Sequence, residues 1–232
     1  MLPLLVIGVI GLLAFVAVGV AIEAALSPHK PENTRSPAAD PLPGASASPT
    51  SAVTSPATGP LTLVRGSTLI NGLYVGYPHS LTGAVSAAAE YWTQLGSTLD
   101  PDRAATVARL AANPTWATAP QTFAEGPTNT RKTLGLPTSG PVPAGASVQL
   151  EPVEYQVRSA TTDGVTVLLL ADYTTTTTVE GTTTHIGVFP LDMVWTAGDW
   201  KIADANSQDD TNLAALPGSA QASANGWQEM TQ

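Results

Sequence analysis

The stretch VTVLLLADYTTTTTVEGTTTHIGVFPLDMVWTAGDWKI, residues 165–202, decides the fold that the sequence predicts. With the residues just before it, the stretch divides into segments rich in β-branched and aromatic residues, at 148–160, 165–179, 182–196 and 199–205. Three dipeptides that suit two-residue hairpin turns separate these segments: Asp163-Gly164, Glu180-Gly181 and Ala197-Gly198. The pattern therefore predicts a four-stranded antiparallel meander.

Two-residue turns also fix the pairing of every strand, because side chains alternate between the two faces of a sheet. With residues 162 and 165, 179 and 182, and 196 and 199 flanking the turns, one face collects Val153, Tyr155, Val157, Leu168, Leu170, Phe189, Leu191, Met193, Trp195, Trp200 and Ile202. The opposite face is apolar as well, with Val167, Leu169, Ala171, Tyr173, Ile186, Val188 and Val194. A second apolar face has to be covered, either by residues 115–145 or by a partner. Its predicted protein-docking residues are Leu169, Tyr173, Ile186 and Val188.

The threonine-rich part of this region, DYTTTTTVEGTTTHI at 172–186, has two interpretations. Threonine content alone allows an O-glycosylated stalk. The register instead places the threonines on both arms of one hairpin, where β-branching favours extended structure and Thr–Thr pairs form across strands. We therefore expect a protruding β-ribbon.

Helical patterns precede the sheet. Val85, Ala88, Ala89, Trp92 and Leu95 recur at helical spacing, after Pro78 and Ser80 or Thr82 and before Gly96. The segment LDPDRAATVARLAANP predicts a second helix, with Asp100 as its N-cap, Pro101 in its first turn and Pro114 ending it. Prolines and glycines interrupt residues 115–145, so we expect a loop there with one or two short helical turns.

The N-terminus reads MLPLLVIGVIGLLAFVAVGVAIEAAL, and residues 2–22 carry no charge. A helix of that length crosses the roughly 30 Å hydrocarbon core of a bilayer. A cleaved signal peptide is the alternative, but the basic n-region and the shorter apolar core of such peptides are both missing. Residues 1–26 are therefore predicted to anchor the chain as a single-pass cell-membrane protein.

Residues 27–60 are rich in Pro, Ser, Ala and Thr, and they predict a disordered linker between the anchor and a folded domain. Taken alone, Lys30 and Arg35 weakly favour a cytoplasmic C-terminal part. The composition of the linker resembles wall-spanning tethers, and we expect an extracytoplasmic domain. It spans residues 61–205, and a tail at 206–232 is predicted to be partly disordered.

Composition excludes several classes of site. The chain has no cysteine, which rules out disulfides, thiolate metal sites and cysteine nucleophiles. The net charge is −9, and the one basic doublet from residue 61 onward is Arg131-Lys132, so direct nucleic-acid binding is not expected. His29, His79 and His185 are too scattered to predict a metal site, and we expect no cofactor.

The segments GYPHSLTGAVSAAAEYW at 76–92 and MVWTAGDWKIADA at 193–205, in the order helices then bent meander, resemble the cone-shaped nuclear-transport-factor-2-like fold. More narrowly, residues 72–205 resemble single-pass, linker-tethered proteins encoded beside conjugation machinery in high-GC Gram-positive bacteria (actinobacteria). Those proteins are similar to the bitopic assembly subunit of type IV secretion systems. The resemblance implies an α+β domain with helices packed on a curved four-stranded antiparallel sheet. It also implies assembly with other membrane proteins and no active site.

An enzyme is the competing hypothesis, because this fold class also hosts enzymes whose residues line the cone. The inward candidates are Asp172, His185, Tyr155 and Asp204. In the predicted register Asp172 pairs with Phe189, so His185 lies about 13 Å away and cannot act with it as a base and its partner. Tyr91, Trp92, Trp195 and Trp200 are expected to be core aromatics.

The sequence therefore predicts a non-catalytic, membrane-anchored assembly or scaffold subunit, and the resemblance implies that it belongs to a conjugative DNA-transfer (type IV secretion-like) complex. Its predicted partners are the membrane, other membrane-complex proteins and further copies of the chain. A tethered ligand-binding or enzymatic domain that uses the cone interior is the alternative, and a cell-surface protein with a wall-crossing linker is a third hypothesis.

Overall fold

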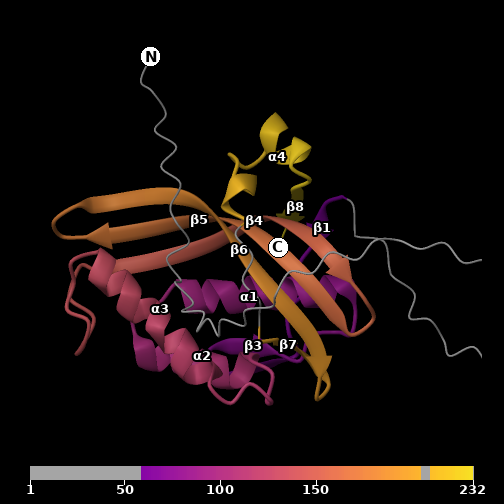
Figure 1. The fold of residues 1–232 in the computed structure, drawn as a ribbon, viewed down its shortest axis with the longest axis horizontal. Coiled ribbons are helices and arrows are strands. Elements are labelled where there is room, and N and C mark those ends of the chain that lie inside the picture. Colours follow the sequence, from indigo (N-terminus) through magenta and orange to yellow (C-terminus); the bar gives the residue numbers. More distant parts are fainter. Residues whose placement is uncertain (1–58, 205–209, 232) are drawn as a thin grey trace, which may run out of the picture. The chain divides into compact units, whose positions relative to one another are not determined.

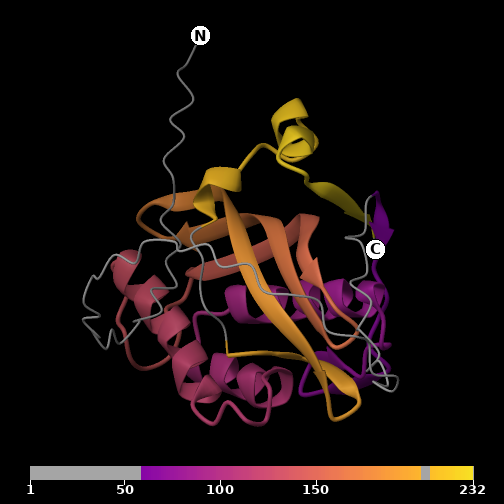
Figure 2. The ribbon, with the colours of Figure 1, turned by 45° about the vertical axis from the view of Figure 1, so that its right-hand side comes forward.

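The computed structural model describes residues 59–204 and 210–231 (Figures 1 and 2). Six strands form one sheet in the order β1-β8-β4-β5-β6-β7. Their bounds are β1 (Leu61–Thr62), β8 (Gln228–Thr231), β4 (Ser147–Ala160), β5 (Gly164–Thr177), β6 (Gly181–Thr196) and β7 (Asp199–Ile202). The strands β1 and β8 run parallel, and every other neighbouring pair is antiparallel.

The predicted four-stranded antiparallel cone is therefore wrong. The meander β4-β5-β6-β7 exists, but β8 and β1 extend it on the β4 side into a six-stranded mixed sheet. These two strands contain only four and two residues, too few for a periodic pattern, and they join opposite ends of the domain. Leu61 and Met230 lie near opposite ends of the domain in sequence, so patterns that pair neighbouring segments do not predict their parallel pairing.

Three helices cover one face of the sheet: α1 (Leu81–Gly96), α2 (Pro101–Ala111) and α3 (Ala119–Thr133) (Figure 1). The first two confirm the prediction. Ser80 caps α1 by accepting a hydrogen bond from the Gly83 backbone N–H at 3.0 Å, and Asp100 caps α2 through the Asp102 N–H at 2.9 Å. A separate hairpin of β2 (Thr68–Ile70) and β3 (Leu73–Val75) precedes α1.

The loop predicted at 115–145 is wrong over half its length, because α3 runs for 15 residues through Pro127. Pro120 lies in the first turn, where a missing N–H costs nothing. Pro127 is buried in the helix interior, and α3 packs along α2. Tertiary packing here outweighs the roughly 3 kcal/mol that an interior proline costs a helix.

One of the three predicted turns is correct. Thr196 pairs with Asp199, and the turn residues Ala197 and Gly198 both have positive φ, at 53° and 79°, as a type I′ turn requires. The β5–β6 connection instead has three residues, since Thr177 pairs with Gly181. The β4–β5 connection is longer than predicted too, and two bulges interrupt its register.

Between the two bulges of β4, at residues 154–157, and along the whole β5–β6 ladder, the pairing is shifted by three residues, an odd number that exchanges the two faces of a strand. Tyr155 pairs with Leu169 and not with Asp172, and Asp172 pairs with Ile186 and not with Phe189. Relative to β4, the second shift restores the predicted faces of β6 and β7, so the prediction exchanged the two faces of β5 only. The helix-covered core therefore contains Val165, Val167, Leu169 and Ala171 from β5, together with Tyr155, Val157, Leu191, Met193, Trp200 and Ile202.

The other face of the sheet is covered by the C-terminal segment, which contains η1 (Thr211–Leu213) and α4 (Ala220–Ala224) and ends in β8 (Figure 2). Trp227 and Ala222 pack there on Leu168 and Leu170, with Ile186 and Val188 beside them. The sequence placed the end of the domain at residue 205. Residues 210–231 instead form regular elements that complete the sheet and its second core.

The predicted anchor at 1–26 and the linker up to residue 58 lie outside the described residues. Within 59–204 and 210–231, no helix combines the length and apolar character needed to cross a membrane.

Candidate functional site

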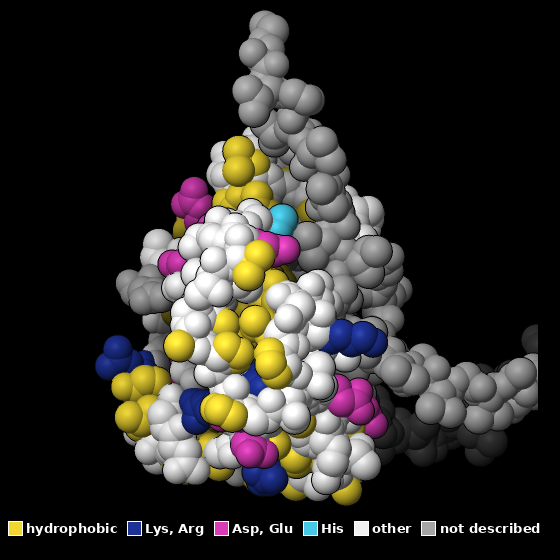
Figure 3. Space-filling view, turned by 90° about the vertical axis from the view of Figure 1, so that its left-hand side faces the viewer, with side chains coloured by type: hydrophobic (Ala, Val, Ile, Leu, Met, Phe, Trp, Pro, Cys, Tyr) yellow, Lys and Arg dark blue, Asp and Glu magenta, His cyan; other side chains and the backbone are white. Residues whose placement is uncertain are grey.

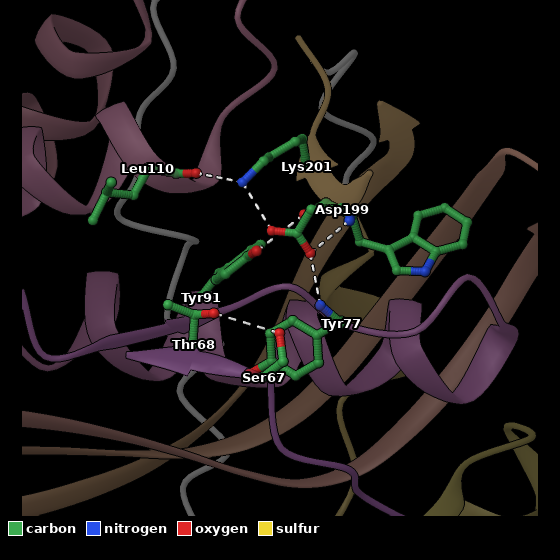
Figure 4. Close-up of polar contacts among 8 residues, drawn as sticks. Ser67, Thr68, Tyr77, Tyr91, Leu110, Asp199 and Lys201 are labelled. Atoms are coloured by element: carbon green, nitrogen blue, oxygen red, sulfur yellow. Dashed lines mark hydrogen bonds and ion pairs between the residues drawn. The ribbon is translucent and has the colours of Figure 1, made fainter. Parts of the chain in front are cut away.

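Asp199, at the start of β7, is the centre of the best-connected polar cluster (Figure 4). Its Oδ1 accepts hydrogen bonds from the backbone N–H groups of Tyr77 at 2.8 Å and Trp200 at 2.9 Å. Its Oδ2 lies 2.9 Å from the Nζ of Lys201, which also donates to the Leu110 carbonyl at 2.7 Å. Asp199 is only 6% exposed, and both of its carboxylate oxygens accept from protein donors.

Two tyrosines beside this carboxylate are held in their neutral form. Burial raises the pKa of Tyr91, and the negative charge of Asp199 raises it further. Burial likewise raises the pKa of Tyr77, with the charge of Glu90 as the next cause. The hydroxyl of Tyr91 donates to the Trp200 carbonyl at 3.0 Å. Asp199, with a donor on each carboxylate oxygen, and the neutral Tyr91 hydroxyl thus connect β7 to α1 and α2. The cluster contains no activated base.

A second cluster joins the start of α1 to the β4–β5 turn. The ring of His79 stacks on Trp195 at 4.1 Å with an interplanar angle of 8°, and its Nε2 lies 2.9 Å from the Oδ1 of Asp163. The same nitrogen lies 2.9 Å from the carbonyl oxygen of Thr162. Asp163 is 67% exposed, so the contact between His79 and Asp163 lies at the surface of the domain. No sequence signal connected His79 with a turn 83 residues away.

Arg131, the first residue of the basic doublet Arg131-Lys132, has a buried guanidinium. Its Nε donates to the Leu99 carbonyl at 2.6 Å, and its Nη1 donates to the carbonyls of Pro137 and Gly140 at 3.3 and 2.8 Å. The side chain thus holds the end of α3 and the loop after it against the start of α2. This arginine is used inside the domain and does not contribute to a basic surface.

The enzyme candidates do not form a site. Asp172 pairs with Ile186, and His185 pairs with Tyr173, so the two side chains project from opposite faces of the ribbon. Tyr155 is buried in the helix-covered core and donates to the Gly59 carbonyl at 2.9 Å, while Asp204 is exposed after β7. Across the part of the chain that the structure describes, no group of three or more His, Asp or Glu residues has the arrangement to hold a metal ion.

The four predicted docking residues do not share a face. Leu169 is 0% exposed in the helix-covered core, and Tyr173 packs against the same core. Ile186 and Val188 lie on the opposite face, where they pack beside Leu168, Leu170 and the C-terminal segment. The inversion of β5 explains this difference, because it exchanges the faces of Leu169 and Tyr173 while those of Ile186 and Val188 stay in place.

A different surface remains unpaired: the outer edge of β6. Strand β6 pairs with β5 from Gly181 to Val194, but β7 covers only residues 193–196 of its other side. The Trp195 N–H points to the β5 side, where it donates to the backbone carbonyl of Asp163, and the Asp192 carbonyl points outward, where it accepts from the Ala203 N–H. The register has no break, so even-numbered residues direct their backbone groups outward along the strand.

Four residues therefore present free backbone N–H and C=O groups along this side: Thr182, Thr184, Ile186 and Val188. We call them the open edge of β6. Among the described residues, no backbone hydrogen bond other than those of the β5 ladder reaches them. At the next outward position, Pro190 has no N–H to offer, and its carbonyl oxygen accepts from the Trp92 indole at 3.2 Å.

The other strand edges of the described sheet are short or blocked. At β7, Asn113 donates its backbone N–H to the Ile202 carbonyl at 2.8 Å. On the free side of β4, the Ser97 hydroxyl accepts from the Leu150 N–H at 2.9 Å. The outermost strand β1 has only two residues. Strand edges are normally protected in such ways. Among residues 59–204 and 210–231, no comparable hydrogen bond reaches β6 between 182 and 188, although η1 lies near the strand.

The threonines lie on both arms of the β5–β6 hairpin, as predicted. They do not form a separate protruding ribbon, because β4 runs beside β5 as far as the pairing of Ser147 with Thr176 (Figure 1). The hydroxyls of Thr174 and Thr184 lie 2.9 Å apart, and those of Thr176 and Thr182 lie 3.0 Å apart. Val179 in the turn is 92% exposed. Seen from this end, uncharged polar side chains and backbone dominate the middle of the surface, with hydrophobic side chains between them (Figure 3).

The profile of one protein family, described as a domain of unknown function (DUF8175), matches residues 24–228. The chain belongs to this family. The match covers the helices, the meander and the C-terminal segment up to the first residue of β8, so the segment that covers the second face of the sheet is part of the DUF8175 domain. No curated protein and no solved structure matches the chain.

Proposed function

We propose that this DUF8175 protein is a non-catalytic assembly module, which binds an extended segment of a protein partner at the open edge of β6. The observation that carries the proposal is the row of free backbone groups at Thr182, Thr184, Ile186 and Val188. A strand that lies along such an edge gains main-chain hydrogen bonds at every second residue. Its side chains then alternate between the two faces of the ribbon.

The composition of the edge supports this use. Between Gly181 and Leu191 there is no Lys, Arg, Asp or Glu, although charged residues are a common means of protecting an exposed strand. The one proline of this stretch, Pro190, lies where the Trp92 indole already occupies the outward carbonyl group of β6. An edge that is long and uncharged, and to which no described residue outside β5 makes a backbone hydrogen bond, is a liability unless it has a partner.

The interior of the domain supports the same conclusion. The space between the sheet and the helices is filled by large side chains, among them Trp200, Tyr91 and Leu169. The buried carboxylate of Asp199 is neutralised by Lys201 and by backbone donors. No specific observation favours the alternative of a ligand-binding or enzymatic interior.

The sequence-based expectations complete the proposal. An anchor at 1–26 and a linker at 27–60 would hold the module near the outer surface of a cell membrane, where its edge meets other membrane-complex proteins. A role in a conjugative, type IV secretion-like complex rests only on the resemblance of residues 72–205, whose implied fold is not the one found. Partner binding at β6 does not depend on that role.

A pair of matched lysine variants of the full-length chain tests the proposal. Thr184→Lys places a charge beside the open edge, whereas Thr174→Lys makes the same change directly across the ladder on the interior strand β5. We expect Thr184→Lys to release the protein from its native complex after mild membrane extraction, as measured on native gels. Thr174→Lys should leave that complex unchanged. If both variants migrate like wild type while keeping the wild-type melting temperature, the proposal is wrong.

A further inference from the structure

We infer that the strand which occupies the open edge of β6 is β6 of a second copy of this chain, paired antiparallel about a twofold axis at His185. This inference rests on the proposed function, and it adds the identity of the partner. Its basis is that the edge complements itself in backbone pattern, in charge and in side-chain shape.

The backbone pattern allows this pairing without any gap. The outward-facing groups belong to Thr182, Thr184, Ile186 and Val188, and two antiparallel copies can face each other with Thr182 opposite Val188 and Thr184 opposite Ile186. All four residues of each strand then find a partner. His185 lies on the axis opposite its own copy, at a position where the backbone groups point back to β5.

This register also avoids like charges in a protein with a net charge of −9. The nearest acidic residues along the ribbon are Glu180 and Asp192, which flank the uncharged stretch. In the twofold arrangement the paired strands span residues 182–188, so Glu180, in the turn, and Asp192, whose outer side is occupied by Ala203, both lie outside the paired segment. No carboxylate lies opposite another one, and like charges directly opposite each other would destabilise the pair.

The side chains of the outer face fit the same pairing. Thr182 and Thr184 would lie beside Val188 and Ile186 of the other copy, and β-branched residues pack well across antiparallel strands. Within one copy the same two threonines already face Thr176 and Thr174, with hydroxyls 3.0 and 2.9 Å apart. In the dimer, the row of β-branched side chains on this face therefore runs from β5 and β6 of one copy across the axis to β6 and β5 of the other.

One pair of short strands buries less than the roughly 1,600 Å² of a standard interface, so the association is weak in dilute solution. A shared membrane changes this, because tethering two copies to one surface raises their effective concentration. We therefore expect the dimer to form between copies anchored in the same membrane, and the experiments below use membranes.

The absence of cysteine from the chain gives a direct test of the register. His185→Cys places one thiol of each copy at a non-hydrogen-bonded antiparallel pair, where Cα atoms lie about 4.5 Å apart and a disulfide can form. In the same pairing, two Thr183→Cys residues would be four positions apart, about 13 Å, which is too far for a disulfide. Mild oxidation of membranes that hold each full-length variant should give a disulfide dimer with His185→Cys and none with Thr183→Cys.

A third variant shows whether the dimer depends on the edge. Thr184→Pro removes one outward N–H without taking a donor from the β5 ladder. Combined with His185→Cys, it should reduce the yield of disulfide dimer at least tenfold, while Thr174→Lys combined with His185→Cys should not. An equal yield from His185→Cys and Thr183→Cys would mean random collision and would overturn the inference.

The outcomes also separate this inference from the proposed function. If His185→Cys gives no dimer while Thr184→Lys still releases the chain from a complex with a different protein, the second copy is the wrong partner and strand addition is retained. If neither variant has an effect, both proposals fail.

Discussion

The indole Nε1 of Trp92 donates a hydrogen bond to the carbonyl oxygen of Pro190 over 3.2 Å, and this contact marks where the covered part of β6 ends. Pro190 has no N–H, and its carbonyl is occupied by α1, so the strand offers nothing to a partner at this position. Two residues further toward the turn, at Val188, the outward backbone groups are free. The helix and the proline together set the length of the open edge.

Pro190→Ala should lengthen that edge, because alanine restores an outward N–H. We expect the fold to be retained and self-association of the full-length chain to increase, measured as a higher yield of the His185→Cys disulfide dimer. The matched control is Pro152→Ala in β4, which lies in a bulged part of the ladder away from β6. An unchanged dimer yield with Pro190→Ala would show that position 190 does not limit pairing.

Leu169→Asp should unfold the domain, in contrast to the behaviour expected of a docking residue. Leu169 is fully buried beneath the helices, and an unpaired carboxylate there costs several kcal/mol, more than most domains can lose. The measurement is thermal unfolding by circular dichroism, with Thr175→Asp on the same strand as the control. A Leu169→Asp protein that melts like wild type would contradict the register.

The sequence predicted the strands better than it predicted their pairing. Ala197-Gly198 forms the two-residue turn that its residue types favour, because both positions need positive φ. At Glu180-Gly181 the glycine also has positive φ, at 74°, but it follows a three-residue loop and is the first paired residue of β6. Residue types show that a glycine-dependent turn is present, whereas loop length depends on which residue takes the left-handed conformation. One miscounted residue moves a whole strand to the other face.

The open edge itself could not be read from the sequence. It exists because β7 is four residues long while β6 has sixteen, and because β8 and β1 add to the β4 side of the sheet. Short strands carry no periodic signal, and the partner of an edge depends on the whole topology. The uncharged run from Gly181 to Leu191 was the available signal, and its meaning required the pairing of β6.

Substitutions in the Asp199 cluster should have unequal effects. Asp199→Ala leaves the largely buried Lys201 ammonium without its carboxylate and removes the acceptor of two backbone N–H groups, so we expect a loss of about 3–5 kcal/mol in unfolding free energy. Lys201→Met should cost less, because Asp199 keeps both backbone donors. Urea unfolding of the two variants checks the order. Equal losses would mean that the ion pair alone accounts for the role of Asp199.

Trp227→Ala tests whether the C-terminal segment is part of the cooperative fold. Trp227 is buried on Leu168 and Leu170, and its indole donates to the Leu213 carbonyl at 2.8 Å. We expect a loss of about 3–5 kcal/mol. Leu216→Ala, in the same segment but 66% exposed, should change stability by less than about 0.5 kcal/mol. A neutral Trp227→Ala would show that the segment contributes little to the stability of the domain.

Tyr91 should make the domain sensitive to alkaline pH. Its pKa is raised above the ordinary 10.0 chiefly by burial, so between pH 10 and the folded-state pKa the unfolded chain loses a proton that the folded chain keeps. The stabilisation is fully present below pH 10 and declines above it, by up to about 1.4 kcal/mol for each pH unit. Tyr91→Phe removes this dependence, although loss of the hydrogen bond to the Trp200 carbonyl should cost about 1–2 kcal/mol at pH 8. Urea unfolding of both proteins at pH 8, 10 and 11 should therefore show their stabilities converging as the pH rises. Parallel curves would mean that the Tyr91 phenol ionises equally easily in the folded and unfolded chains.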